Sequence, residues 1–174
     1  EYPTIVFSEV NRYTVAHEIA HQWWYGVVGN DQYAEPWLDE SLATWSEELP
    51  WEAWVGCPSY AFPGSARLTN DMGYWGDHPA QYDVVYDGGG CMLANLARRF
   101  GSARFLQILR GYAADNWLGV ARTGDFTSAI EDAGLVLDLE GGTNIGVFMG
   151  VSHNDYQNIQ GGGTDRKGIS AHSP

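Results

Sequence analysis

The sequence is poor in basic residues and in cysteine, and it lacks any long hydrophobic run. Lys and Arg together number 9 against 22 Asp and Glu, which gives a net charge of −13. Nucleic-acid-binding proteins carry a basic patch, and segments that dock on anionic membranes are polybasic, so this balance argues against both kinds of partner. Because no run of about 18 apolar residues is present, we expect no membrane-spanning helix.

The first residue and the cysteines carry limited information. The chain begins with Glu1 rather than Met and shows no basic-then-apolar leader, so we expect a processed chain or an excised piece. Cys57 and Cys91 either pair in an oxidising compartment or lie apart as small buried residues. The sequence leaves this pairing, the compartment and the oligomeric state open.

What is present is enough for a packed domain. A length of 174 residues with 44% hydrophobic residues fits one globular domain with a sizeable core. The 8 Trp, 10 Tyr and 6 Phe pack in that core or line a substrate cleft. We predict one domain over 1–139 and a Gly-rich, polar C-terminal tail over 140–174.

The hydrophobic pattern is mainly helical. From Arg12 to Val28, the residues Val15, Ile19 and Trp23 recur every four positions, which predicts one helix with Trp23 in the core. Residues 50–85 read as a long ordered loop with a short helix. Further helices are expected from Glu35-Pro36 to Pro50, from Gly90 to Gly101, from Ser102 to about Tyr112, and over 125–133. The expected fold is therefore mainly α, with little or no sheet.

The strongest motif is His17-Glu18-Ile19-Ala20-His21. Histidines four residues apart lie on one face of a helix, so that their rings can converge on a single ion. Glu18, the next residue round the helix, can approach a metal-bound water without being a ligand. This is the HExxH pattern of zinc peptidases. The alternative is that His17 and His21 are two ordinary helix histidines that bind no metal.

A catalytic zinc usually has three protein ligands and one open position. No further histidine or cysteine follows His21 at the spacing of other zinc sites, but Glu40 stands in the next predicted helix. A turn over 29–35 would fold that helix back against the first. Glu40 is then either the third ligand or a solvated helix carboxylate; among apolar neighbours, an unpaired carboxylate would be costly.

The stretch HEIAHQWWYGVVGN…EPWLDESLATW resembles the gluzincin pattern of M1-type metallopeptidases, the family of aminopeptidase N and leukotriene A4 hydrolase. In that family eighteen residues separate HExxH from the ligand Glu, and 22–39 fill this gap here. The resemblance covers about 12–45 and, more weakly, 84–134. It implies a helical, thermolysin-like catalytic domain, Zn²⁺ as the cofactor, and His17, His21 and Glu40 as metal ligands.

The resemblance also implies roles for residues outside the metal set. Glu18 would be the base that activates the metal-bound water. Tyr86, in Tyr86-Asp87-Gly88-Gly89, matches the family's Tyr-x-(Lys/Arg)-Gly motif, whose Tyr steadies the oxyanion, although Gly88 replaces the basic residue. Tyr82 and Tyr74 compete for this role, and Tyr86 could instead be a packing ring.

Further residues are carried over with weaker motifs. Glu1 matches the Glu of a Gly-x-Met-Glu motif that holds the substrate's free amino group, but the Gly-x-Met part does not precede it here. Asp39, Thr44 and Glu47 are candidates to orient the histidines, or they are ordinary polar residues on a helix surface. Trp24 is a candidate for packing around the site.

The sequence therefore predicts zinc-dependent hydrolysis of peptide bonds, most consistent with an aminopeptidase acting on peptide substrates. A small endopeptidase is a variant of this prediction, because the anchor for a free amino group is incomplete. The alternatives from other classes are a catalytically silent, metal-stabilised module that binds peptides, and an aromatic-rich carbohydrate-binding domain. The intact Glu18 speaks against a silent module, and no motif supports carbohydrate binding.

Overall fold

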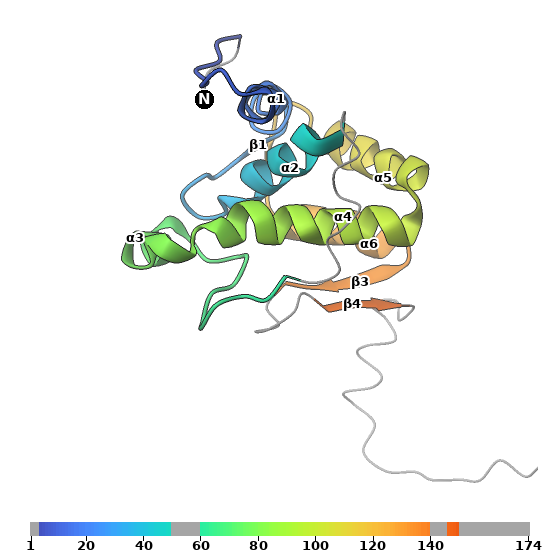
Figure 1. The fold of residues 1–174 in the computed structure, drawn as a ribbon. Helices are drawn as coiled ribbons and strands as arrows, with labels where there is room; N and C mark the ends of the chain where they lie inside the picture. Colours follow the sequence, from blue (N-terminus) through green and yellow to red (C-terminus); the bar gives the residue numbers. More distant parts are fainter. Residues whose placement is uncertain (1–3, 50–59, 140–145, 150–174) are drawn as a thin grey trace, which may run out of the picture.

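A computed structural model describes residues 4–49, 60–139 and 146–149. Within these residues the protein is mainly helical, as predicted, and its strands are short (Figure 1). The helices are α1 (Arg12–Ala20), α2 (Trp37–Glu48), α3 (Met72–Asp77), α4 (Gly89–Phe100), α5 (Ser102–Asp115) and α6 (Thr123–Asp132). A 3₁₀ turn, η3 (Pro79–Gln81), and a π-helical turn, η4 (Val84–Gly88), precede α4.

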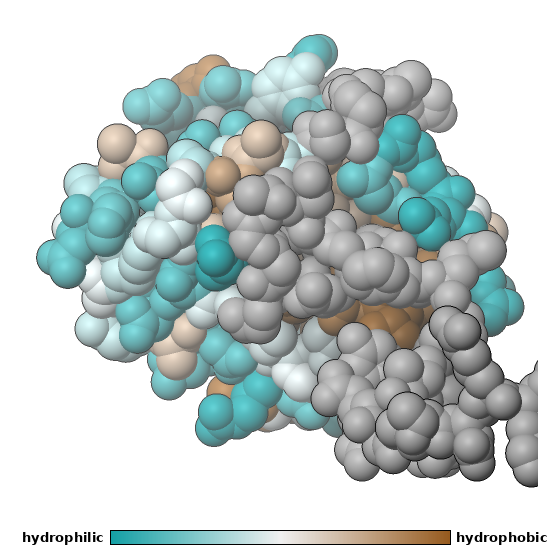
Figure 2. All heavy atoms as spheres, turned by 90° about the horizontal axis from the view of Figure 1, so that it is seen from below, coloured by the Kyte–Doolittle hydropathy of each residue, from teal (hydrophilic) through white to brown (hydrophobic). Residues whose placement is uncertain are grey.

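The strands form two separate pairs. β1 (Gly29–Asn30) runs parallel to β2 (Val120–Ala121), with Gly29 opposite Val120. β3 (Leu135–Asp138) runs antiparallel to β4 (Gly146–Met149), with Leu135 opposite Met149. The face of the molecule seen in Figure 2, on the β3–β4 side, has hydrophilic residues over much of its visible surface and a hydrophobic area near its centre.

Helix α2 lies at the centre of the fold and packs against α1, η4 and α4 (Figure 1). Most of its length is buried, because apolar residues face the core on one side and small residues allow close neighbours on the other. The indole of Trp37 is fully buried, packs edge to face on Phe126 and donates a hydrogen bond to Thr123 Oγ1 at 2.9 Å. α2 is therefore fixed by tertiary contacts on nearly every side.

The approach of α4 to α2 depends on Gly89. A Cβ added at Gly89 would overlap the side chain of Ser41 on α2. The Ser41 hydroxyl itself donates a hydrogen bond to the carbonyl of Val85 at 2.5 Å, in the turn that leads into α4. The last glycine of the Tyr86-Asp87-Gly88-Gly89 motif is thus needed for helix packing.

Replacing Gly89 with Ala is expected to lower the free energy of unfolding by about 1–3 kcal/mol, because inserting a methyl group into a filled contact forces the two helices apart. Urea denaturation would measure this change. Gly111 on α5 is the matched control, because a Cβ there meets nothing within 4 Å. Gly111→Ala should stabilise the protein by about 0.5–1 kcal/mol through helix propensity. A Gly89→Ala protein as stable as the wild type would show that the helices can separate without cost.

The first helix is shorter than predicted. α1 ends at Ala20, and 21–28 form successive turns rather than continuing the helix to Val28. The reason is tertiary: the Val27 carbonyl accepts a hydrogen bond from Leu118 N at 2.8 Å, and β1 then pairs with β2. Gly26 permits the turn, since a Cβ at this residue would lie 2.5 Å from the Gln22 carbonyl oxygen.

The predicted apolar stripe of this helix does not face the core. Val15, Ile19 and Trp23 are exposed, and Trp23 is 44% exposed, so its assignment to the core was wrong. Its indole packs edge to face on Trp117, with ring centroids 5.5 Å apart. The face of α1 that meets α2 instead carries His17, and His21 follows on the same side as the residue directly after the helix.

The remaining expectations divide between described and undescribed residues. The helices predicted after Gly90, after Ser102 and over 125–133 correspond to α4, α5 and α6. The long loop contains α3, but 50–59, with Cys57, lie outside the described residues; Cys91 is buried on α4. The domain boundary at 139/140 stays a prediction, and of the predicted tail only β4 is described.

Within the described ranges, no helix combines the length and apolar character needed to cross a bilayer.

Candidate metal centre

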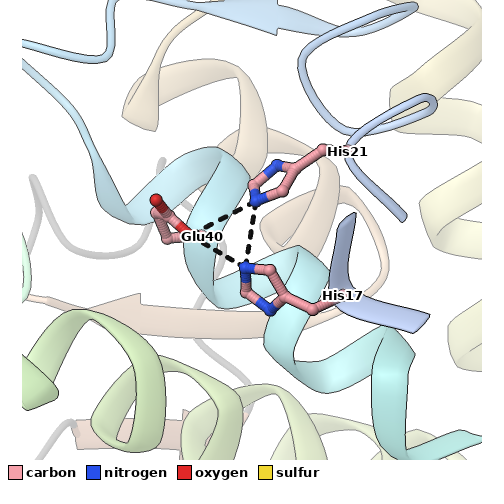
Figure 3. A group of neighbouring side chains, drawn as sticks. All are labelled: His17, His21 and Glu40. Carbon is pink, nitrogen blue, oxygen red and sulfur yellow. Dashed lines mark hydrogen bonds and ion pairs between the residues drawn. The ribbon is translucent and has the colours of Figure 1, made fainter. Parts of the chain in front are cut away.

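Three side chains from α1 and α2 converge on one point (Figure 3). One helical turn separates His17 from His21, and their Nε2 atoms are 3.0 Å apart. Glu40 Oε2, from α2, lies 3.0 Å from His17 Nε2 and 3.3 Å from His21 Nε2. The nitrogens and the oxygen lie within 4.8 Å of one another, so the three residues form a group that could hold a metal ion.

The electrostatics of the group favour an anionic carboxylate. Burial would raise the pKa of Glu40, but hydrogen bonds and charge from His17 and His21 lower it to about 2. Burial would lower the pKa of His17, but Glu40 and Glu47 raise it to about 9. Two imidazole nitrogens and one carboxylate oxygen are the donors of a catalytic zinc site, so this set fits Zn²⁺.

Each histidine is also held at its other ring nitrogen. His17 Nδ1 lies 3.0 Å from Glu47 Oε2 and 3.5 Å from Thr44 Oγ1, both on α2. His21 Nδ1 lies 3.2 Å from the backbone carbonyl oxygen of Trp24. The side chain of Trp24 is buried, and its indole donates a hydrogen bond to Ser46 Oγ at 2.9 Å. These contacts fix both rings so that their Nε2 atoms face Glu40.

The Asp39 side chain is hydrogen-bonded to residues that precede α2. Its carboxylate is buried and accepts hydrogen bonds from Asn30 Nδ2 at 2.8 Å and from Gln32 Nε2 at 2.7 Å. Burial, only partly offset by these bonds, raises the pKa of Asp39 to about 6. Asp39 thereby ties the loop before α2 to the start of that helix, next to Glu40.

A pocket of about 330 Å³ adjoins the metal group. Glu18 lines it from α1, and Tyr86 lines it from η4. The Tyr86 ring centroid is 5.9 Å from that of His17. Burial, followed by the charge of Glu40 and hydrogen bonds to Glu40 and Tyr82, raises the pKa of Tyr86 above its usual range. The remaining lining residues are Tyr13, Thr14, His17, Thr44, Glu47 and Asp87.

Tyr74, Tyr82 and Tyr86 compete for the predicted role of the tyrosine that steadies the oxyanion, and they differ in where the structure places them. Tyr82 packs edge to face on Tyr86 with centroids 5.4 Å apart, and it is not among the residues that line this pocket. The Tyr74 hydroxyl donates a hydrogen bond to Gln81 Oε1 at 3.1 Å, away from the pocket. Of the three, Tyr86 is the one beside His17 and Glu18. π-helical turns such as η4 are frequent at functional sites.

Two groups relevant to the proposed site, the Glu1 side chain and the Trp24 backbone carbonyl, differ in whether the structure describes them. Glu1, the predicted anchor for a free amino group, lies outside the described residues, and its role stays a prediction. The Trp24 carbonyl was missed, because a backbone acceptor leaves no mark in the side-chain sequence. The position of Glu47 can be inferred from the sequence. It lies seven residues after Glu40 on the same helix, and Thr44 lies four after Glu40, so the three side chains share one face.

The sequence is similar to curated aminopeptidases. Aminopeptidase M1-B of Oryza sativa subsp. japonica is 27% identical over 135 residues, which cover 68% of this chain and 15% of that protein. Alanine/arginine aminopeptidase of Saccharomyces cerevisiae is 26% identical over 139 residues, covering 68% and 16%. Aminopeptidase N of Streptomyces lividans is 26% identical over 146 residues, covering 71% and 17%.

Each match covers only a small part of the similar protein's length. The chain spans about 15% of the length of the curated proteins that it matches. No family model matches the sequence, and no solved structure matches it significantly. The similarity therefore links this chain to one segment of M1 aminopeptidases.

Proposed function

We propose that this chain forms the zinc-binding part of a peptidase of the M1 aminopeptidase type, which hydrolyses peptide bonds at the amino end of its substrates. The observation that carries the proposal is the convergence of His17, His21 and Glu40 beside a pocket lined by Glu18 and Tyr86. The names of the similar proteins support the same class of reaction. We also propose 1–139 as the catalytic region and 140–174 as its tail.

In this proposal His17, His21 and Glu40 hold the metal. Bound zinc supplies Lewis acidity, which polarises the scissile carbonyl and makes water more acidic. The carboxylate of Glu18 takes a proton from the attacking water and later gives it to the nitrogen of the leaving amine. The hydroxyl of Tyr86 donates a hydrogen bond to the oxygen of the substrate carbonyl as negative charge develops there.

The printed names of the relatives favour an aminopeptidase over a small endopeptidase, because each of them is called an aminopeptidase. A catalytically silent peptide-binding module is not favoured. Such a module would need the metal ligands but not a carboxylate like Glu18, which lines the pocket beside His17.

The proposal is tested by measuring zinc content and the hydrolysis of aminoacyl-p-nitroanilides by purified protein. The wild type is expected to bind one zinc ion per chain. His21→Ala should lose both zinc and activity, because a site reduced to two protein ligands binds zinc much more weakly. His78→Ala is the matched control, since His78 stacks on Tyr74 rather than facing the metal group, and it should retain zinc. A wild-type protein without zinc, or a His21→Ala protein with full zinc, would contradict the assignment.

A further inference from the structure

Helix α2 holds both nitrogens of one histidine. Glu40, Thr44 and Glu47 follow one another at intervals of four and three residues, so that all three side chains lie on one face of α2, toward α1. Glu40 Oε2 lies 3.0 Å from Nε2 of His17, and Glu47 Oε2 lies 3.0 Å from Nδ1 of the same ring. A ring held at both ends cannot rotate about its Cβ–Cγ bond without breaking one of these contacts.

The chemistry of the acceptors determines which nitrogen is left to bind a metal. An ionised carboxylate and a backbone carbonyl only accept hydrogen bonds. Glu47 therefore places the hydrogen of His17 on Nδ1, and the Trp24 carbonyl does the same for His21. In both rings Nε2 faces Glu40, so Nε2 is the nitrogen that would be free of its hydrogen and bind a metal while the hydrogen bond from Nδ1–H is kept.

Glu47 is placed to act through His17. The two side chains are 17% and 12% exposed, so that little water competes for the Nδ1–H hydrogen bond. Thr44 Oγ1 is the more distant partner at 3.5 Å, at the outer limit for a hydrogen bond. Glu47 also lines the pocket, which makes direct substrate binding the competing role for this residue.

We infer that Glu47 is a positioning residue that fixes the tautomer and orientation of His17, and thereby sets the affinity of the His17, His21 and Glu40 group for its metal. This inference rests on the proposed metal site. It assigns to Glu47 no contact with the metal and no proton transfer. Outer partners of this kind typically change metal affinity by about 10–100-fold.

The test compares Glu47→Ala and Glu47→Gln with wild-type protein in two measurements. One is the zinc dissociation constant from competition with a chromophoric chelator, and the other is the visible spectrum of the Co²⁺-substituted protein. Glu47→Ala should weaken zinc binding about 10–100-fold and alter the Co²⁺ spectrum. Glu47→Gln should restore most of the affinity, because its side-chain oxygen still accepts a hydrogen bond from Nδ1.

Glu48→Ala is the matched control, because it removes the neighbouring carboxylate of α2, which points about 100° away round the helix. It should bind zinc like the wild type. Rescue by Gln excludes loss of fold as the cause, and circular dichroism checks each variant.

Three results would overturn the inference. Zinc binding by Glu47→Ala within about threefold of wild type, with only KM for the peptide changed, would assign Glu47 to substrate binding. Equal losses in the Ala and Gln variants would exclude the hydrogen bond as the cause. A wild-type protein that binds no zinc would overturn the proposed function together with this inference, whereas the first two results would leave that function standing.

Discussion

Glu18→Gln is expected to retain zinc and to lose nearly all peptidase turnover. The side chain lines the pocket beside His17 but is not one of the three converging ligands, so its replacement leaves the metal set intact. An amide cannot accept the proton of the attacking water, and loss of such a base typically costs about 10²–10⁴-fold in rate. Zinc content and kcat on an aminoacyl-p-nitroanilide, measured on the same preparation, check both parts.

Glu9→Gln is the matched control for this substitution. Glu9 is exposed and precedes α1, and the same isosteric change of charge there should leave both zinc and turnover unchanged. If Glu18→Gln kept activity within about tenfold of the wild type, which is ~1.4 kcal/mol of barrier, Glu18 would not be the base.

Tyr86→Phe is expected to lower kcat by about 10²–10³-fold and to change KM little. The reason is that a donor to the oxyanion acts on charge that appears only in the transition state. The Tyr86 ring lies 5.9 Å from that of His17, and its hydroxyl interacts with Glu40, so the group is adjacent to the proposed metal ligands. Steady-state kinetics on one peptide substrate would separate kcat from KM.

Tyr82→Phe is the control, because Tyr82 packs on Tyr86 but does not line the pocket. It should leave kcat within a few-fold of wild type. The reverse pattern, a large loss in Tyr82→Phe and none in Tyr86→Phe, would transfer the oxyanion role to Tyr82. Equal, small effects of both substitutions would show that neither hydroxyl serves the reaction.

The local sequence determined the elements that carry the site. Histidines four apart share a helix face whatever surrounds them, and α1 does present His17 and His21 together. Pro36 and Gly101 marked the start of α2 and the end of α4, since proline favours a helix start and glycine adopts the positive φ that follows a helix end. Of the site residues, His17, His21, Glu40, Glu18 and Tyr86 could be named from motif and spacing.

The local pattern predicted the wrong buried face and the wrong end for α1. A recurrence of apolar residues every four positions predicts which residues share a face, but not which face meets the core. In α1 the polar face with the histidines packs on α2, while Val15 and Ile19 remain exposed. The helix also stops at Ala20, because pairing of β1 with β2, distant in sequence, competes with further helix.

By itself, then, the sequence determined which three residues are proposed as metal ligands, because His17, His21 and Glu40 follow from motif and spacing along one chain segment. Only the tertiary structure decided how the set is oriented. The contact of Glu47 with His17 joins residues 30 apart, the Trp24 carbonyl holds His21 through the backbone, and Gly89 admits Ser41 at the contact of α4 with α2. These distances depend on how α1, α2 and α4 pack together, and no periodicity within a single helix encodes that packing.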